Sequence, residues 1–180
     1  MVFKPMLPVP QSGKCWLKPP HDIIKINFDT VVSPEKIGVG MIVRDSDGFV
    51  LGGGGSVIDA KMTAAWAEFK ALEESIKFAK TLRFTQTLNI QKVYSETDCV
   101  SLVNRINKRG QDITPLGFYT EVICTQLKQF THSKVLWANR FCNKIADFIC
   151  KHSIVDNCNS IFKLDYPENI YELVMKDLIN

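Results

Sequence analysis

The sequence lacks the features that mark metal-thiolate sites, phosphate loops and membrane spans. Its three histidines have no metal-ligand spacing, and none of its six cysteines forms a C-x-x-C pair. The glycine run 52–55 is followed by no G-K-[ST] motif. No apolar run approaches bilayer-spanning length, and three early prolines interrupt any signal-peptide core. We therefore expect an intracellular protein of the nucleus or cytoplasm with reduced thiols, neither secreted nor in contact with a membrane.

Length and composition indicate one globular domain with tails. A chain of 180 residues, 46% hydrophobic and 23% charged, can bury one core but is short for two domains. Its net charge of +3 permits nucleic acid as a partner without requiring it. We expect a monomer with a proline-rich arm over 1–20, a domain over 21–154, and an extension over 155–180 whose short helix starts at Pro167.

The first half of the domain is expected to form three antiparallel strands. Apolar Ile24, Ile26 and Phe28 alternate with polar residues, the period of a strand, and Asp29 falls on the polar face at its far end. Two apolar runs around "RDSDG" then indicate a hairpin. The glycine run that follows is interpreted as an edge bulge or a flexible exit from the strand.

The second half supplies helices and two more strands. Spacing and cap signals predict, in order, a helix over 62–82, a strand within 88–98, a helix near 99–107, a helix over 114–130, a strand over 133–139 and a helix over 143–154. Thr114 and Asn143 are the expected N-caps of the last two helices. The predicted fold class is α/β, a five-stranded mixed sheet with helices on both faces.

Four acids stand where these strands end or helices run: Asp29, Glu68, Asp98 and Asp147. Each has a structural explanation, since Asp29 suits a turn, Asp98 an N-cap and Asp147 a solvated first turn beside the helix dipole. Glu68 lies at the edge of an apolar stripe, where a charge needs a partner. Together they would repel one another unless protons or cations neutralised them, and carboxylate oxygens suit Mg²⁺ or Mn²⁺.

Five motifs, taken in order, resemble the type 1 ribonuclease H domain in its retroelement-derived, reverse-transcriptase-like form abundant in plant genomes. They are "INFDT", "GMIVRDSDGFVLGGG", "AAWAEFKAL", "SETDC" and "NRFCNKIAD". The likeness runs from about Trp16 to Ile154 and implies a ribonuclease H-like fold. Each motif is weak alone, but the ordered set is specific.

The resemblance implies that Asp29, Glu68, Asp98 and Asp147 bind two Mg²⁺ or Mn²⁺ ions. One ion would lower the pKa of an attacking water and the other would stabilise the departing 3′ oxygen. The expected reaction is endonucleolytic cleavage of the RNA strand of an RNA–DNA hybrid, leaving 5′-phosphate and 3′-hydroxyl ends. Selectivity would come from contacts to 2′-hydroxyls.

Further positions match family positions or lie near the expected active edge, and are candidates for substrate contact: Asn27, Thr30, Arg44, Asn104, Arg140 and Asn143. Ordinary structural roles remain open for Arg44 as a strand-end charge and for Asn143 as a cap. Thr30 replaces the family's glycine.

A second departure concerns the family's loop histidine, whose place is taken by Trp137. Indole cannot shuttle a proton, so Trp137 is interpreted as a packed strand residue. The alternative function is therefore a domesticated retroelement remnant that binds nucleic acid with weak or no cleavage.

Overall fold

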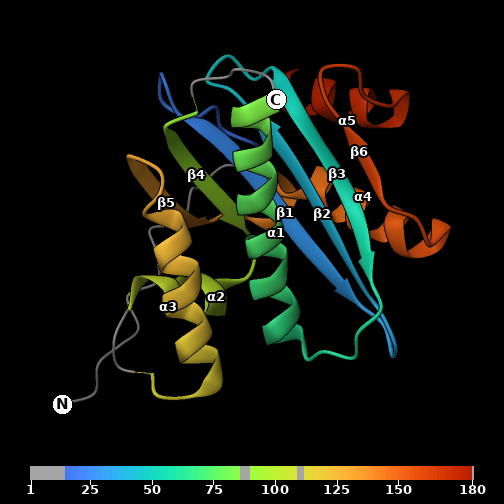
Figure 1. The fold of residues 1–180 in the computed structure, drawn as a ribbon. Helices are drawn as coiled ribbons and strands as arrows, with labels where there is room; N and C mark the ends of the chain where they lie inside the picture. The colour runs from blue at the N-terminus through green and yellow to red at the C-terminus, as the bar shows by residue number, and fades with distance from the viewer. Residues whose placement is uncertain (1–14, 86–89, 109–111, 180) are drawn as a thin grey trace.

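A six-stranded mixed sheet forms the middle layer of the computed structural model, which describes residues 15–85, 90–108 and 112–179 (Figure 1). Its strands lie in the order β5-β4-β1-β2-β3-β6. Their bounds are β1 (Ile24–Val32), β2 (Ile37–Arg44), β3 (Val50–Ile58), β4 (Lys92–Thr97), β5 (His132–Trp137) and β6 (Ser160–Phe162). The α/β class is confirmed, whereas the prediction of five strands was wrong by one.

The first three strands form the predicted antiparallel meander, β4 pairs in parallel with β1, and β5 pairs in parallel with β4. Along β1, Ile26 and Phe28 enter the larger hydrophobic core. The intervening polar residues Lys25, Asn27 and Asp29 are also buried. A period-two pattern suggested a half-buried strand, but both faces of β1 are covered.

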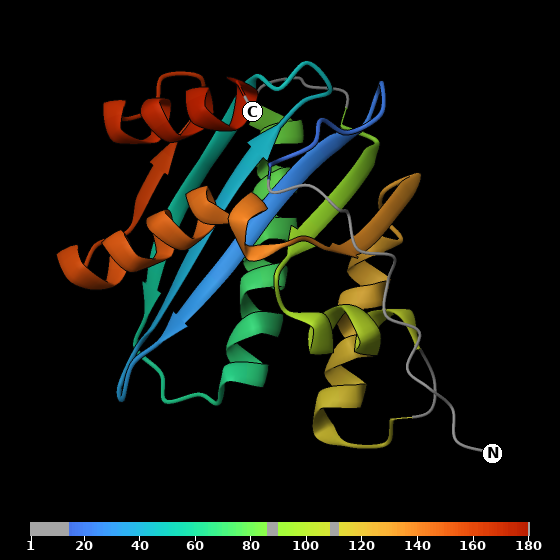
Figure 2. The same ribbon diagram turned by 180° about the vertical axis from the view of Figure 1, so that it is seen from behind.

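Helices lie on both faces of the sheet, as predicted (Figures 1 and 2). One face carries α1 (Ala64–Thr85), α2 (Val100–Asn107) and α3 (Pro115–Leu127), and the other carries α4 (Lys144–Asp156) and α5 (Glu168–Ile179). A short 3₁₀ turn, η1 (Arg140–Cys142), precedes α4. The larger core includes Phe28 and Phe69, and a smaller one joins Ile42 of β2 to Ile145 of α4 and Ile170 of α5.

The missed strand β6 explains the glycine run. Residues 53–55 are regular strand, paired with β2 on one side and with β6 on the other, rather than an edge bulge or a flexible exit. The pairing of β3 with β2 does shift register just before residue 53, because Val43 pairs with Gly52 whereas Arg44 pairs with Val50. A Cβ at Gly53 would lie 2.5 Å from the ring of Phe162, so only glycine lets this ring cover the strand.

Two predicted caps differ from the structure and one holds. Thr114 caps α3 by accepting a hydrogen bond from the Gly117 N–H, as expected. Asp98 is not the N-cap of α2, because that helix starts one residue later and Cys99 takes the cap position. Asn143 occupies the N-cap position of α4, but its side chain makes no capping bond and instead donates from Nδ2 to the Phe28 carbonyl oxygen.

The segment after residue 154 packs on the sheet. Its helix α5, predicted from Pro167, buries Ile170 and Val174 in the smaller core. At the other end of the described chain, Trp16 is buried as well. Among the helices of the described ranges, none is long and apolar enough to cross a membrane.

Candidate active site

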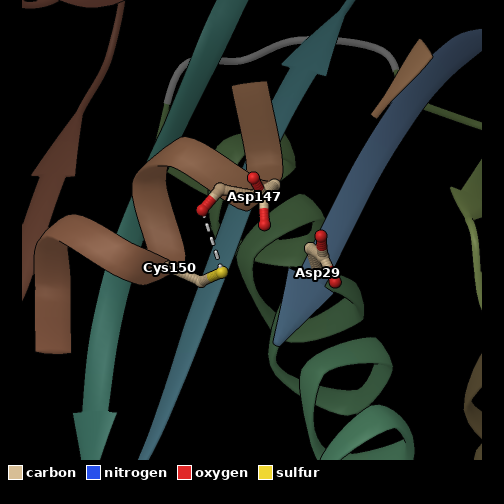
Figure 3. A group of neighbouring side chains, drawn as sticks. All are labelled: Asp29, Asp147 and Cys150. Atoms are coloured by element: carbon tan, nitrogen blue, oxygen red, sulfur yellow. Dashed lines mark hydrogen bonds between the residues drawn. The ribbon is translucent and has the colours of Figure 1, made fainter. Parts of the chain in front are cut away.

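Close packing of α4 on the antiparallel strands β1 and β2 positions the site. Asp29 pairs with Gly40 across β1 and β2, and α4 lies over that pair. Figure 3 shows Asp147 and Cys150 on α4 next to Asp29 on β1. One ligand atom from each of these three residues lies within 4.8 Å of the others.

Two further acids, on other elements, interact electrostatically with this group. Glu68 comes from α1, and the charges of Asp29 and Asp98 raise its pKa. Asp98 follows β4, and its charge also raises the pKa of Asp29. The Glu68 side chain hydrogen-bonds Thr97, the last residue of β4, while its Oε2 atom is buried without a partner. Each of the four predicted acids therefore interacts electrostatically with at least one other, although they come from α1, from α4, from within β1 and from the residue after β4.

Burial and mutual repulsion raise the proton affinity of the innermost acids. Burial, followed by the charge of Asp98, raises the pKa of Asp29 from 3.8 to about 7, although the Thr30 N–H donates to Asp29 Oδ1 at 2.8 Å. Burial, followed by the charges of Asp29 and Asp98, raises the pKa of Glu68 from 4.5 to about 8. These shifts come first from burial of the two carboxyl groups and second from the negative charge of the acids around them.

Asp98 and Asp147 each form an ion pair with a basic side chain. Arg140 Nε lies 3.2 Å from Asp98 Oδ2, and Lys151 Nζ lies 2.7 Å from Asp147 Oδ2. The Arg140 side chain is 83% exposed and that of Lys151 is 59% exposed, so each pair forms on the solvent side of the cluster.

The donor set fits a hard divalent cation. Carboxylate oxygens are the ligands that Mg²⁺ and Mn²⁺ prefer, and the unpartnered Glu68 Oε2 adds one buried acceptor. Cys150 is a softer neighbour, and its Sγ donates to the Asp147 carbonyl oxygen at 3.1 Å. Burial raises the pKa of the Cys150 thiol well above its usual range.

The predicted substrate contacts divide into buried and accessible residues. Asn27 and Arg44 are 1% and 0% exposed, which argues against direct contact with a large ligand. Asn143 is equally buried, with its side chain against Phe28. Thr30 is half-buried, and its hydroxyl donates to the Gly38 carbonyl. Asn104 is also half-buried and lines a cleft between α2 and α3, so of the set only Arg140 is fully accessible.

Arg44 instead belongs to a buried network that joins both ends of the described chain. Its Nη1 lies 2.8 Å from Asp177 Oδ2 on α5, and its guanidinium lies 3.6 Å from the centre of a Trp16 ring. Arg44 Nη2 and Trp16 Nε1 both donate to Asn27 Oδ1, and Asn27 Nδ2 donates to Glu96. Both amide atoms of Asn27 and both Nη atoms of Arg44 therefore have intramolecular partners, whereas the buried Nε of Arg44 has none among the described residues.

Trp137 packs against the larger core at the end of β5, as the sequence suggested. Its Nε1 donates to the Asp98 carbonyl oxygen at 3.2 Å. The indole thus supports the backbone of a candidate site residue.

Sequence reasoning missed Gly40, Cys150 and Lys151. The spacing of Asp147 and Lys151, four residues apart on a predicted helix, was a usable signal for the ion pair. Cys150, one turn after Asp147, could have been placed on the same helix face. The importance of Gly40 had no local signal, because it depends on where α4 crosses β2.

Comparison with known proteins gives a family and a fold. Residues 27–153 match the model of the family described as reverse transcriptase-like. A search of curated protein sequences gives no significant match.

Several solved structures share the fold at low sequence identity. RNase H1 from the halophilic archaeon Halobacterium salinarum NRC-1 superposes with a TM-score of 0.66 at 18% identity, over 74% of this chain and 98% of that one. LC11-RNase H1 in complex with an RNA/DNA hybrid gives 0.62 at 18% identity, over 75% and 97%. The foamy viral protease-reverse transcriptase bound to an RNA/DNA hybrid gives 0.54 at 15% identity, over 72% of this chain and 19% of that one. The chain belongs to the reverse transcriptase-like family, and its domain has the RNase H-like fold.

Proposed function

We propose that this protein is a divalent-metal-dependent endonuclease that cleaves the RNA strand of RNA–DNA hybrids. The observation that carries the proposal is the approach of Asp29 and Asp147, whose carboxylate oxygens lie within 4.8 Å of each other, together with the charge interactions that link Asp29 to Asp98 and Glu68 to both. Negative charge concentrated in this way, with pKa values of about 7 and 8 at its centre, is suited to holding cations.

In this proposal the four carboxylates hold two Mg²⁺ or Mn²⁺ ions. Bound ions of this kind lower the pKa of an attacking water and stabilise the leaving oxygen of a phosphodiester. The chain's own groups fix the geometry: the Thr30 N–H orients the Asp29 carboxylate, and Thr97 holds the Glu68 side chain from the end of β4. Arg140 lies beside Asp98 with its guanidinium exposed, where it can meet a phosphate.

Two solved structures with the same fold, LC11-RNase H1 and the foamy viral enzyme, were determined with RNA/DNA hybrids. Their identity to this chain is 18% and 15%, so the substrate of this protein is inferred from the fold and the acids together.

The experiment is cleavage of an end-labelled RNA–DNA hybrid with Mg²⁺ or Mn²⁺. We expect the parent protein to leave 5′-phosphate and 3′-hydroxyl ends, and the Asp29→Asn variant to leave the RNA strand intact. Asp156→Asn, an exposed acid on the same helix as Asp147, is the matched control and should cleave like the parent. An intact hybrid with both the parent and the control would overturn the proposal.

One observation favours a second candidate, a hybrid-binding domain that does not cleave. Trp137 takes the place of a proton-carrying histidine, and its N–H is committed to the Asp98 carbonyl. Binding of the hybrid by the parent and by Asp29→Asn alike, with no cleavage by either, is the outcome that selects this candidate.

A further inference from the structure

Lys151 lies beside the acidic cluster but has no part in the function proposed above. It stands one helical turn after Asp147 on α4, and its Nζ contacts Asp147 Oδ2 at 2.7 Å. Its side chain is 59% exposed, whereas that of Asp147 is 30% exposed. The lysine therefore approaches the carboxylate from the solvent, the side from which a nucleic-acid strand must also come.

A divalent ion and the Lys151 ammonium would compete for the same carboxylate oxygen. Two positive charges so close repel each other, and an exposed lysine on a flexible stem loses little by leaving an ion pair. Once the carboxylate holds an ion, the anion nearest to Lys151 is a phosphate of the strand lying over the acids. Ammonium groups bind backbone phosphates without regard to sequence.

We propose that Lys151 is a substrate-positioning residue with two successive partners: Asp147 before metal binding, and a backbone phosphate of the nucleic acid afterwards. This inference rests on the proposed function, because it assumes that the acids hold ions and that a nucleic-acid strand lies over them.

The competing explanation is that the pair only stabilises the helix. An acid four residues before a lysine is a common helix-supporting arrangement. Lys77 on α1 makes a pair of the same kind with Glu73, at 3.3 Å, and its side chain is 50% exposed. Lys77 also pairs with Glu74, at 3.1 Å, so Lys77→Gln removes helix pairs of this kind away from the four acids and is the matched control.

The first readout is the affinity for Mn²⁺, measured by calorimetry on the full chain. Lys151→Gln removes both the competitor and its repulsion, so the dissociation constant should fall about two- to fivefold, the range of an exposed ion pair. Lys77→Gln should leave it unchanged.

The second readout is hybrid binding as a function of salt, followed by fluorescence anisotropy with Mn²⁺ present. The RNA strand carries phosphorothioate linkages, which keep the backbone charge and slow cleavage. Loss of one phosphate contact should weaken binding at every sequence and reduce the log–log salt slope by about 1. Lys151→Arg should keep the parental slope.

The outcomes separate this inference from the function on which it rests. A parent that binds Mn²⁺ and hybrid, together with a Lys151→Gln variant that behaves like Lys77→Gln in either readout, overturns the role of Lys151 alone. A parent that binds neither Mn²⁺ nor hybrid overturns both proposals. Tighter Mn²⁺ binding combined with a shallower salt slope supports the two-partner role.

Discussion

Gly40 and Ala146 lie so close that no side chain fits between them. A Cβ at Gly40 would stand 2.3 Å from the Ala146 carbonyl oxygen and 2.4 Å from the Cys150 backbone nitrogen. Since Gly40 also pairs with Asp29, this contact sets how near α4 comes to β1 at Asp29. The distance between Asp29 and Asp147 therefore depends on a residue that carries no functional group.

Gly40→Ala should push α4 away from the sheet. We expect a loss of about 1–3 kcal/mol in the free energy of unfolding, the usual cost of overpacking, and weaker Mn²⁺ binding because Asp147 moves away from Asp29. Urea unfolding and calorimetry measure the two effects. Gly54→Ala is the control: its Cβ would meet the Ser160 carbonyl at 2.3 Å, on the far side of the sheet. It should lose stability but keep its metal affinity, and equal metal affinities in both variants would contradict the role of Gly40.

The raised pKa values of Asp29 and Glu68 predict how stability changes with pH in a chelating buffer. These groups titrate near pH 7 and 8 in the folded protein but near pH 4 in the unfolded chain. Between pH 4 and 8 the folded state therefore holds more protons, and the free energy of unfolding must fall as pH rises. Urea unfolding of the parent across this window measures the fall.

Asp29→Asn removes one of the groups responsible for that fall. At pH 8 it should be more stable than the parent by on the order of 4 kcal/mol, with the difference shrinking toward pH 4. Glu172→Gln, which neutralises an exposed acid of α5, should follow the parental curve. A parent whose stability rises from pH 5 to 8 would show that the acids are not crowded in this way.

The ion pair of Arg44 with Asp177 predicts that α5 is needed for folding. Arg44 is fully buried, so Asp177→Ala leaves a guanidinium with too few acceptors. We expect a loss of about 3 kcal/mol or more in urea unfolding. The double variant Arg44→Met with Asp177→Leu should recover part of that loss, because it removes the buried charge altogether. Asp59→Asn, which breaks the exposed pair with Lys36, should change little.

The sequence predicted local features, such as strands and caps, better than it predicted which distant segments pack over them. The placement of Asp29 on a strand followed from alternation with Ile26 and Phe28, and the Thr114 cap followed from residue type, although β1 runs on to Val32 and Asp29 is not its end. Burial of Arg44 could not be predicted, because its partner Asp177 lies 133 residues away. Strand β6 has only three residues, two of them exposed, so it left no periodic signal.

The candidate site was predicted for a different reason. Because clustered acids repel one another, a cluster is expected to need cations, but this does not identify which acids lie together. The grouping of Asp29 with Glu68, Asp98 and Asp147 came from family resemblance. The same resemblance also proposed Asn27 and Arg44 as substrate contacts. Both are instead enclosed by Trp16 and α5, and no local pattern marks that cover.

Trp137 gives the last prediction, because it occupies the position where the family's histidine was expected. Its ring packs on the core and its N–H donates to the Asp98 carbonyl. Trp137→Phe keeps most of the packing and loses the hydrogen bond, so it should cost about 1 kcal/mol in urea unfolding. Trp137→His loses most of the ring contact as well and should cost about 3 kcal/mol.

Introducing the family's histidine at position 137 should therefore not increase the rate of hybrid cleavage. An imidazole at position 137 would start from a half-buried strand end, where the indole contacts the Asp98 backbone rather than its carboxylate. We expect hybrid cleavage by Trp137→His to be equal to or slower than that of the parent, measured at a temperature where both remain folded. Faster cleavage would mean that the end of β5 can open and present this side chain to the acids, and it would return position 137 to the set of catalytic candidates.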